Sequence, residues 1–564
     1  MKMALLEVKE KEFEMYDILL INPINHYGVA SNPLGLQILT SICKQNNYNA
    51  KLLDLSLLHK QEGFLFTDDI FNWIEEKIKQ YPAKYYGISV MNGTFIWGIT
   101  IAKIIKKIEP ESIVFVGGPQ ATALKEKIFD VCQWFDYCLL YEGETTIVNF
   151  LAYLEKQTLD IPCNVIKKNN TCYRYQLTCE NINNIPAIDY SDYYNARIID
   201  VEVGRGCPYS CYYCSAKSLV GHNIRYKNIE CILQESQNVY NNMNKSTRKY
   251  INFNHDNFLS NRKNFKEFVS KKINENYNFP YGCEGRIDAI DDEIINDLSD
   301  SNCVYIFVGL ESESKRIQKI AKKNLNLDNI SEKIKKITSK GIFFETNFII
   351  GFPEETLDDL YDTIKLASKL AWLDTNIRIS YSFMSPEPGS EVFEKTSLEN
   401  CLMVKTDGTY LDLEKSGFNM EKFPTLYFNH LYTIKNPNYD VLYYVHCASI
   451  FFPMLYKYQI ATYIMFNLKH KNICKVFEQL DQFSAEEEAI LFFYEKYKGE
   501  LSLIEQELII YEINMNRIFE NKIQEYSQEY SYSIQKIYRE VKQDKRNFLK
   551  INDYKKSPTK IVKK

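Results

Sequence analysis

The chain of 564 residues is 45% hydrophobic, which is enough apolar material for the cores of three or four domains. Its formal net charge of −5 and its isoelectric point near 6.0 give no electrostatic basis for general nucleic-acid binding. Its fifteen cysteines do not fit a small disulfide scaffold and favour a reducing cytoplasm, where thiols can ligate metals.

The apolar stretches of the chain do not have the pattern of targeting or membrane segments. The run near the N-terminus is short and charged residues follow it directly, unlike in a signal peptide. The most apolar late stretch, residues 448–466, is interrupted by Pro453, Lys457 and Gln459, so we expect a buried amphipathic helix there. We therefore expect a cytoplasmic protein without a membrane partner.

Residues 1–157 are expected to form a doubly wound, Rossmann-like α/β domain. Continuous apolar strands that alternate with helices are typical of a parallel sheet covered on both faces. The runs of strand length are 17–22, 50–55, 85–90, 112–119 and 136–144. Ligands of such sheets bind beyond the carboxyl ends of the strands. The loops at those ends are 22–28, 89–94, 117–120 and 142–145.

Two further regions follow this domain. Residues 158–197 are expected to be a linker because of the turn-forming residues Pro162 and Pro186, with a short hairpin over 165–177. Residues 198–395 repeat a strand and a helix six times, which predicts a partial (β/α)6 barrel with its active site at the carboxyl ends of the strands. The expected strands lie near 199–203, 250–254, 279–285, 303–308, 343–350 and 377–383.

A cysteine-rich loop, VEVGRGCPYSCYYCSAK, follows the first of these strands. Its cysteines, spaced C-x3-C-x2-C, can hold three irons of a four-iron, four-sulfur cluster and leave the fourth iron open. A structural zinc would need a fourth ligand, for which His222 and Cys231 are the nearest candidates, at unusual spacing. The cysteines are Cys207, Cys211 and Cys214.

This loop resembles the cluster loop of radical S-adenosylmethionine (SAM) enzymes. The resemblance implies a [4Fe-4S] cluster on the three cysteines and SAM chelated to the open iron, where it is cleaved to a 5′-deoxyadenosyl radical. Later segments follow the order of the family. They are His255–Phe258, Gly309–Ser312, Gly351–Thr356 and Pro386–Ser390.

The same resemblance implies a set of SAM-binding residues. Glu311 would meet the SAM ribose, although an acid at this position could instead cap the following helix. His255 stands where the family has an aspartate, and it is either a catalytic acid or a hydrogen-bonded structural histidine. The implied SAM-binding residues are Tyr213, Glu284, Arg286, Gly309, Glu311, Ser312 and Gly351.

The segments PLGL, GGP and EGE ahead of the cysteine loop look like the cobalamin-binding domain fused to many radical SAM enzymes. The glycine pair at 117–118 could also be only a tight turn, and the domain could have lost cobalamin. The implied cobalamin-binding residues are Asn25, Ser89, Asn92, Thr94, Gly117, Gly118, Pro119, Gln120, Glu142, Gly143 and Glu144.

One departure concerns the cobalt ligand. Many cobalamin domains carry D-x-H-x-x-G, whereas this chain has INHYGV at 24–29. The histidine, His26, is present, but the aspartate that would orient its imidazole and the glycine are missing. His26 therefore either ligates cobalt or is a solvent-facing loop residue.

Residues 396–564 are expected to be mainly helical and, by position, to cover the open side of the barrel and shape the substrate pocket. Ser484–Glu487 has the pattern of a capping box ahead of an apolar face. The aromatic residues of this region favour a packed core.

Over residues 15–395 the resemblance implies a cobalamin-dependent radical SAM enzyme. It would methylate an unactivated carbon of a natural-product intermediate or peptide through a 5′-deoxyadenosyl radical and methylcobalamin, with electrons from a flavodoxin or ferredoxin. The alternative is a non-methylating radical SAM enzyme for cyclisation, rearrangement or oxidation, with cobalamin as redox partner or absent. A non-enzymatic cofactor sensor is the third hypothesis.

Overall fold

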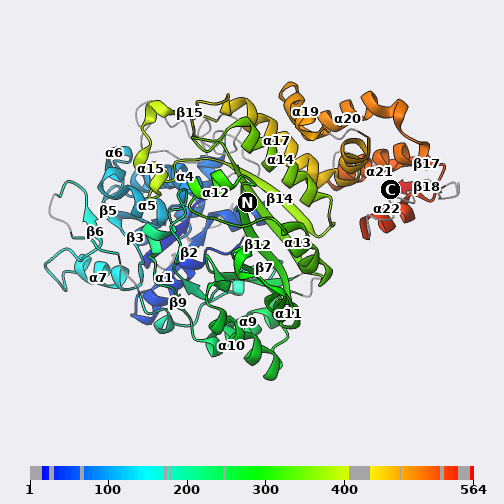
Figure 1. The fold of residues 1–564 in the computed structure, drawn as a ribbon. Helices are drawn as coiled ribbons and strands as arrows, with labels where there is room; N and C mark the ends of the chain where they lie inside the picture. The colour runs from blue at the N-terminus through cyan, green and yellow to red at the C-terminus, as the bar shows by residue number, and fades with distance from the viewer. Residues whose placement is uncertain are drawn as a thin grey trace, which may run out of the picture.

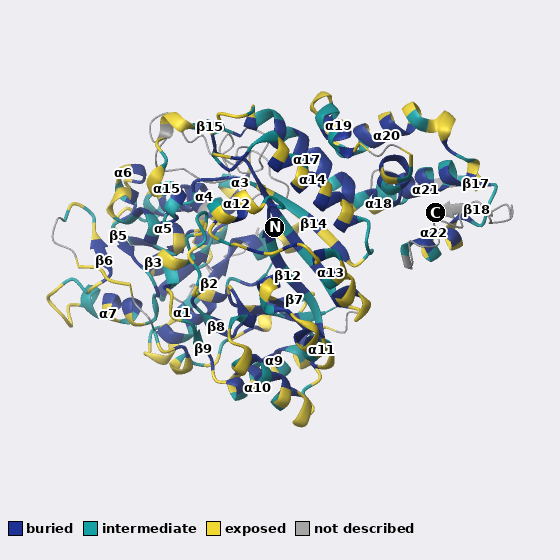
Figure 2. Cartoon of the chain, in the orientation of Figure 1, coloured by how far each residue is buried: buried dark blue, intermediate teal, exposed yellow. Residues whose placement is uncertain are grey.

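The computed structural model places two six-stranded sheets next to each other, with a helical region beyond them (Figure 1). The residues described are 15–24, 31–63, 69–170, 174–177, 180–244, 249–404, 432–469, 472–520, 526–543 and 559–563. Burial is concentrated in the strands and on the helix faces turned toward them (Figure 2).

The first sheet has the order β2-β1-β3-β4-β5-β6, and its first five strands are parallel. Alternate side chains of β1 enter two separate cores: Ile18 and Leu20 pack toward α1 and α7, and Leu19 and Ile21 pack toward α3 and α4. Because both faces are buried, the strands are apolar throughout, which confirms the predicted doubly wound sheet. The strands are β1 (Tyr16–Asn22), β2 (Ala50–Asp54), β3 (Ala83–Ser89), β4 (Ile113–Gly117), β5 (Tyr137–Leu139) and β6 (Val165–Lys167). The helices are α1 (Leu34–Gln45), α2 (Leu55–Glu62), α3 (Ile70–Lys79), α4 (Phe95–Ile108), α5 (Pro119–Leu124), α6 (Ile128–Val131) and α7 (Glu144–Leu154).

The hairpin predicted over 165–177 is wrong in its pairing. β6 pairs antiparallel with β5 and becomes the edge strand of the first sheet. Residues 174–177 form no strand, although the backbone N–H of Asn164 donates to Arg174 O at 2.8 Å. The apolar pair Val165–Ile166 is buried by this sheet.

The second sheet contains six parallel strands in the order β14-β13-β12-β11-β10-β7. Its edge strands β7 and β14 do not pair with each other in the described chain, so the barrel is open, as predicted. The strands are β7 (Ile198–Glu202), β10 (Tyr250–Asn254), β11 (Tyr281–Glu284), β12 (Cys303–Glu311), β13 (Phe343–Ile350) and β14 (Ile377–Phe383). The helices of this region are α8 (Ala216–Val220), α9 (Ile229–Asn242), α10 (Arg262–Asn274), α11 (Asp292–Asp300), α12 (Lys315–Ile320), α13 (Ile330–Ser339), α14 (Leu357–Ala371) and α15 (Glu391–Lys395).

The C-terminal region is mainly helical, as predicted, and adds two small antiparallel sheets. Phe452 stacks on Tyr381 with ring centroids 5.1 Å apart, so α17 covers the outer face of the barrel rather than its open side. Residues 405–431 lie outside the described chain. The helices are α17 (Val441–Lys457), α18 (Gln459–Thr462), α19 (Ile473–Glu478), α20 (Glu486–Tyr497), α21 (Leu503–Phe519) and α22 (Ile534–Gln543). The strands are β15 (Cys401–Met403), β16 (Tyr432–Ile434), β17 (Tyr526–Tyr530) and β18 (Thr559–Lys563).

Two sequence expectations for this region have a definite outcome. The capping box over Ser484–Glu487 is wrong, because Ser484 N–H and Oγ donate to Glu488, one residue further on. The capping box ahead of α21 is formed instead by Ser502 and Glu505. Among the described residues, none of the helices has the length and apolar character that crossing a membrane requires.

Candidate active site

The three cysteines lie on the loop between β7 and α8, at the carboxyl edge of the second sheet. None of them forms a disulfide: Cys207 and Cys211 are half-buried and Cys214 is exposed. The loop is shaped by Gly206, whose φ of 96° places it in the left-handed region and whose added Cβ would lie 2.4 Å from Asn223 O. This position therefore requires glycine, and the tight turn brings the thiols to the edge of the barrel.

The donor set fits a polynuclear cluster better than a single ion. Desolvation of the sulfur, together with the neighbouring loop thiols and Asp256, raises the pKa of Cys214 to about 11. In the described chain no three His, Cys, Asp or Glu side chains have the geometry to hold one metal ion. His222 and Cys231 are exposed and do not join the cysteines. A four-iron cluster takes each thiolate on a different iron, so its ligands do not need to converge on one point.

Glu311 lies at the carboxyl end of β12 in a buried polar network. Its Oε1 accepts from Tyr213 Oη at 2.9 Å and from Lys323 Nζ at 2.6 Å, and Glu311 is only 5% exposed. A Cβ on Gly309 would lie 2.1 Å from Glu311 Oε1, so that glycine is needed to admit the network. The helix-cap alternative is wrong, since Ser314 caps α12.

Arg286 presents an unused buried donor beside the cysteine loop. Its Nε and Nη2 donate to Asp288, and Nη2 also donates to Lys323 O at 2.8 Å. The guanidinium lies 4.0 Å from the ring centre of Tyr209. Nη1 is buried and donates to no described residue, which is the arrangement that an anionic group such as the SAM carboxylate would complete.

The other implied SAM residues differ in what their side chains can reach. Glu284 is exposed at the end of β11. Ser312 is fully buried and its Oγ lies 3.0 Å from Thr363 Oγ1, so only its backbone can border a ligand. Gly351 has a φ of 91°, and an added Cβ would lie 2.8 Å from Val441 of α17.

His255 is held by packing and by one hydrogen bond at the end of β10. It is buried and its ring stacks on Tyr226 with centroids 5.1 Å apart. Its Nδ1 accepts from the backbone N–H of Asn257 at 2.8 Å. Burial lowers its pKa to about 4, so the imidazole is neutral at physiological pH, and its Nε2 is buried without a hydrogen bond to a described residue.

The implied cobalamin residues lie on three loops at the carboxyl edge of the first sheet. Gln120 is 3% exposed and its Nε2 donates to no described residue, so a ligand amide acceptor could complete it. Gly118 is needed by the protein itself, since an added Cβ would lie 2.7 Å from Val90 O. Thr94 Oγ1 is used locally, accepting from Met91 N–H at 3.0 Å.

The other implied cobalamin residues either lie outside the described part of the chain or lie on the same loops. Asn25 and His26 lie outside the described residues, and so does the side chain of Asn92. Pro119 is the first residue of α5, which packs against α8 directly after the cysteine loop. The two predicted cofactor sites are therefore neighbours. The other residues on these loops are Ser89, Gly117 and Gly143.

Glu142 and Glu144 form ion pairs with arginines next to the cysteine loop. Arg205, which lies two residues before Cys207, contacts Glu144 at 2.5 Å and Glu142 at 3.2 Å. Its Nε donates to Glu202 of β7 at 2.6 Å, and Arg225 of β9 (Arg225–Tyr226) bonds Glu142 as well. These ion pairs join the first sheet to β7 and to β8 (Gly204–Arg205).

Sequence reasoning missed both basic partners of these networks. Lys323 and Arg205 carry no motif, and their carboxylate partners Glu311 and Glu144 are 12 and 61 residues away. The position of Arg205 between two glycines next to Cys207 was the available signal.

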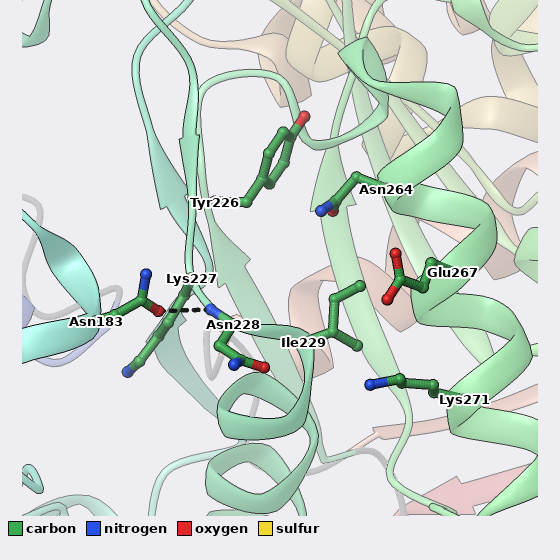
Figure 3. Close-up of a pocket in the computed structure, with 8 residues that line it drawn as sticks. All are labelled: Asn183, Tyr226, Lys227, Asn228, Ile229, Asn264, Glu267 and Lys271. Atoms are coloured by element: carbon green, nitrogen blue, oxygen red, sulfur yellow. Dashed lines mark hydrogen bonds between the residues drawn. The ribbon is translucent and has the colours of Figure 1, made fainter.

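A separate pocket of about 360 Å³ lies between the start of α9 and one side of α10, outside the barrel (Figure 3). Asn183 accepts from Asn228 N–H at 2.7 Å across its rim, and Lys271 pairs with Glu230 at 2.9 Å. It contains none of the residues implied for cofactors. Its lining residues are Asn183, Tyr226, Lys227, Asn228, Ile229, Asn264, Glu267 and Lys271.

Two family models match the chain: the B12 binding domain over residues 24–151 and the radical SAM superfamily over residues 201–367. The chain is 25% identical over 398 residues to an uncharacterized methyltransferase, PH0819, of Pyrococcus horikoshii, covering 69% of this chain and 83% of the relative. It is 20% identical over 404 residues to the anaerobic magnesium-protoporphyrin IX monomethyl ester cyclase of Rubrivivax gelatinosus, covering 67% of this chain and 69% of the relative.

Two solved structures share the fold. The cobalamin-dependent radical SAM enzyme OxsB, with aqua-cobalamin and SAM bound, matches with a TM-score of 0.60 at 14% identity, over 90% of this chain and 80% of OxsB. The radical SAM methyltransferase TsrM of Kitasatospora setae matches with a TM-score of 0.58 at 14% identity, over 78% and 88%. The chain thus belongs to the radical SAM enzymes that carry a cobalamin-binding domain, and its cofactors are a [4Fe-4S] cluster, SAM and cobalamin.

Proposed function

We propose that this enzyme methylates an unactivated carbon of a small natural-product intermediate or a peptide, with electrons from a flavodoxin or ferredoxin. The packing of α5 against α8 is the main support, since it places the cobalamin-side loops beside the cysteine loop. A substrate carbon can then lie between a methyl donor and a site of hydrogen abstraction, which is a problem of positioning.

The chemistry of radical formation and methyl supply belongs to the bound cofactors. The chain contributes the holding groups: Cys207, Cys211 and Cys214 for the cluster, and Arg286 Nη1 for a carboxylate. Glu311 is fixed through Oε1 by Tyr213 and Lys323. No described residue donates to its Oε2, which therefore remains able to accept from vicinal hydroxyls.

Substitution of Glu311 by alanine tests the SAM assignment. We expect Glu311→Ala to weaken SAM binding by about tenfold to a hundredfold, because charge-assisted hydrogen bonds are lost, and to leave cobalamin binding nearly unchanged. Equilibrium titration of the reconstituted protein with each cofactor measures both affinities. Glu313→Ala, two residues away on the same loop, is the matched control. Unchanged SAM affinity would leave Glu311 with only its structural contacts.

The cofactor content and product mass test the proposed reaction. Anaerobically reconstituted protein, incubated with hydroxocobalamin and desalted, is expected to retain cobalamin in about equimolar amount together with a four-iron cluster. A turnover product heavier by one methylene supports methylation. A product without added carbon, or a cluster without retained cobalamin, would favour the non-methylating alternative. The name of the Rubrivivax gelatinosus relative, a cyclase, describes a reaction of that type.

A further inference from the structure

The inner face of the second sheet is polar. In barrels of parallel strands, layers of branched apolar side chains usually fill the interior. Here Ile251 and Phe253 of β10 point outward and are fully buried, whereas the alternate residues Asn252 and Asn254 are half-buried and exposed. The inner face is therefore accessible to a ligand and offers it hydrogen-bonding groups.

The strand register aligns these inner side chains in rows across the sheet. Glu202 pairs with Asn254, Glu284 pairs with Phe307, and Phe307 pairs in turn with Glu345. The row across the middle is Glu202, Asn254, Glu284, Phe307, Glu345 and Arg378. The neighbouring row toward the strand starts is Asp200, Asn252, Gly282, Tyr305 and Phe343.

On β12, β13 and β14 this face is organised by hydrogen bonds. Tyr305 Oη donates to Glu345 Oε2 at 3.1 Å, which fixes that carboxylate. Ser380 Oγ donates to Asn347 Oδ1 at 3.1 Å, and Asn347 Nδ2 donates to Ser382 Oγ at 3.3 Å. Because Asn347 and both serines are accessible, they retain capacity for a ligand with neutral polar groups.

Negative charge is in excess on this face. Glu202 pairs with Arg205, and Glu345 lies 3.5 Å from the half-exposed Arg378, whereas Asp200 and Glu284 form no ion pair with a described residue. Glu284 has no hydrogen bond or ion pair with any described residue. Desolvation inside the barrel, with smaller contributions from the nearby Asp256 and Asp200, raises its pKa to about 7.

A second, independent feature points to a missing partner. Glu202 is 5% exposed and lies in the same row. Its Oε1 accepts from Arg205, but Oε2 is buried and accepts no hydrogen bond from a described residue. A buried carboxylate oxygen without a donor is costly, and a ligand donor would relieve that cost.

We propose that the substrate carries a basic nitrogen, and that Glu284 and Glu345 bind it from either side of Phe307. This inference rests on the proposed function, since it names the substrate class of the same site. Two strand spacings separate the two glutamates, about 10 Å between their Cα atoms, which leaves room for an amine or guanidinium between the carboxylates. The amide and hydroxyls of β13 and β14 then bind neutral polar groups of the same molecule.

An apolar substrate fits this face poorly. A lipid or hydrocarbon surface would desolvate the carboxylates of the row without replacing their water, at a cost of several kcal/mol for each charge. A bound cation stabilises the carboxylates and favours the ionised form of Glu284. The titratable groups near Glu284 are Asp200, Asp256 and Tyr305. Affinity for a basic ligand should therefore rise between about pH 6 and pH 8, as Glu284 ionises.

The test uses two probes that differ only in a basic nitrogen, N-acetyl-lysine amide and N-acetyl-norleucine amide. Each is titrated calorimetrically into the protein loaded with cluster, SAM and cobalamin. We expect the lysine probe to bind at least about tenfold more tightly, and Glu345→Gln to remove most of that preference. Glu332→Gln on α13 removes one exposed carboxylate outside the barrel, and this variant should keep the preference for the lysine probe.

SAM affinity is measured on the same variants and should not change in Glu345→Gln. Equal binding of the two probes, binding of neither, or an undiminished preference in Glu345→Gln would overturn the inference. Such results leave the proposed function standing if the protein still retains cobalamin and cleaves SAM. If the unmodified protein did not cleave SAM, the proposed function would be contradicted instead.

Discussion

Cys211→Ala is expected to abolish the iron–sulfur cluster and all SAM cleavage. Cys211 lies between the other two ligands on one short loop, and its loss leaves two thiols, which cannot retain three irons of the cluster. The other described cysteines lie outside this loop, and most of them are buried. Iron content, the visible spectrum of the reconstituted protein and formation of 5′-deoxyadenosine measure the effect.

The matched control is Cys231→Ala, which removes an exposed thiol from α9, 24 residues after Cys207 in the sequence. We expect it to keep the iron content, the spectrum and the SAM cleavage of the unmodified protein. If Cys211→Ala still cleaved SAM, the assignment of the cysteine loop to the cluster would be wrong. If Cys231→Ala lost iron, Cys231 would be a fourth ligand of the cluster, and the open iron for SAM would be in question.

The strands of both sheets could be predicted because their signals are local. Runs such as 343–350 are apolar on both faces or alternate cleanly, and the structure places β13 at Phe343–Ile350. β6 was mispaired because three residues do not determine their partner, which here is β5. The predicted capping box at Ser484 named Glu487 as the partner, whereas the structure has Glu488. Both glutamates are close enough in sequence to reach the serine, and spacing alone does not decide between them.

The site could be predicted only where a motif carries the chemistry. The cysteines and Glu311 follow family spacing, but Lys323 reaches Glu311 through the turn after α12, and nothing local indicates that contact. The polar inner face was also beyond prediction, because it depends on strand register. Asn252 and Glu345 look like ordinary polar residues until the barrel places both on its inner side.

The ion pairs around Arg205 connect the two cofactor-binding regions at one residue. Arg205 lies between Gly204 and Gly206, immediately before the cysteine loop, and bonds carboxylates from both sheets. Its side chain is 12% exposed, and those of Glu142 and Glu202 are 5% and 6% exposed. Breaking such a buried arrangement leaves uncompensated charge, unlike the loss of a surface pair.

We therefore expect Arg205→Met to destabilise the protein by about 3–5 kcal/mol, as measured by urea unfolding of the apoprotein. Arg262→Met is the matched control, because Arg262 also pairs with two carboxylates, Asp291 and Glu293, but all three side chains are 43–56% exposed. Removing that surface network should change stability little.

The pH dependence separates loss of charge pairing from loss of packing in Arg205→Met. Burial raises the pKa of Glu202, and Arg205 opposes that shift, so the variant should raise it further. The deficit should be smallest below the ordinary glutamate pKa, where Glu202 is protonated in the folded and unfolded states of both proteins. It should grow as pH rises from the folded Glu202 pKa of the unmodified protein to the higher folded pKa of the variant, and then stay constant. A deficit independent of pH would mean that Arg205 stabilises the protein by packing of its aliphatic carbons. The ion pairs between the two sheets would then contribute little to holding the cysteine loop.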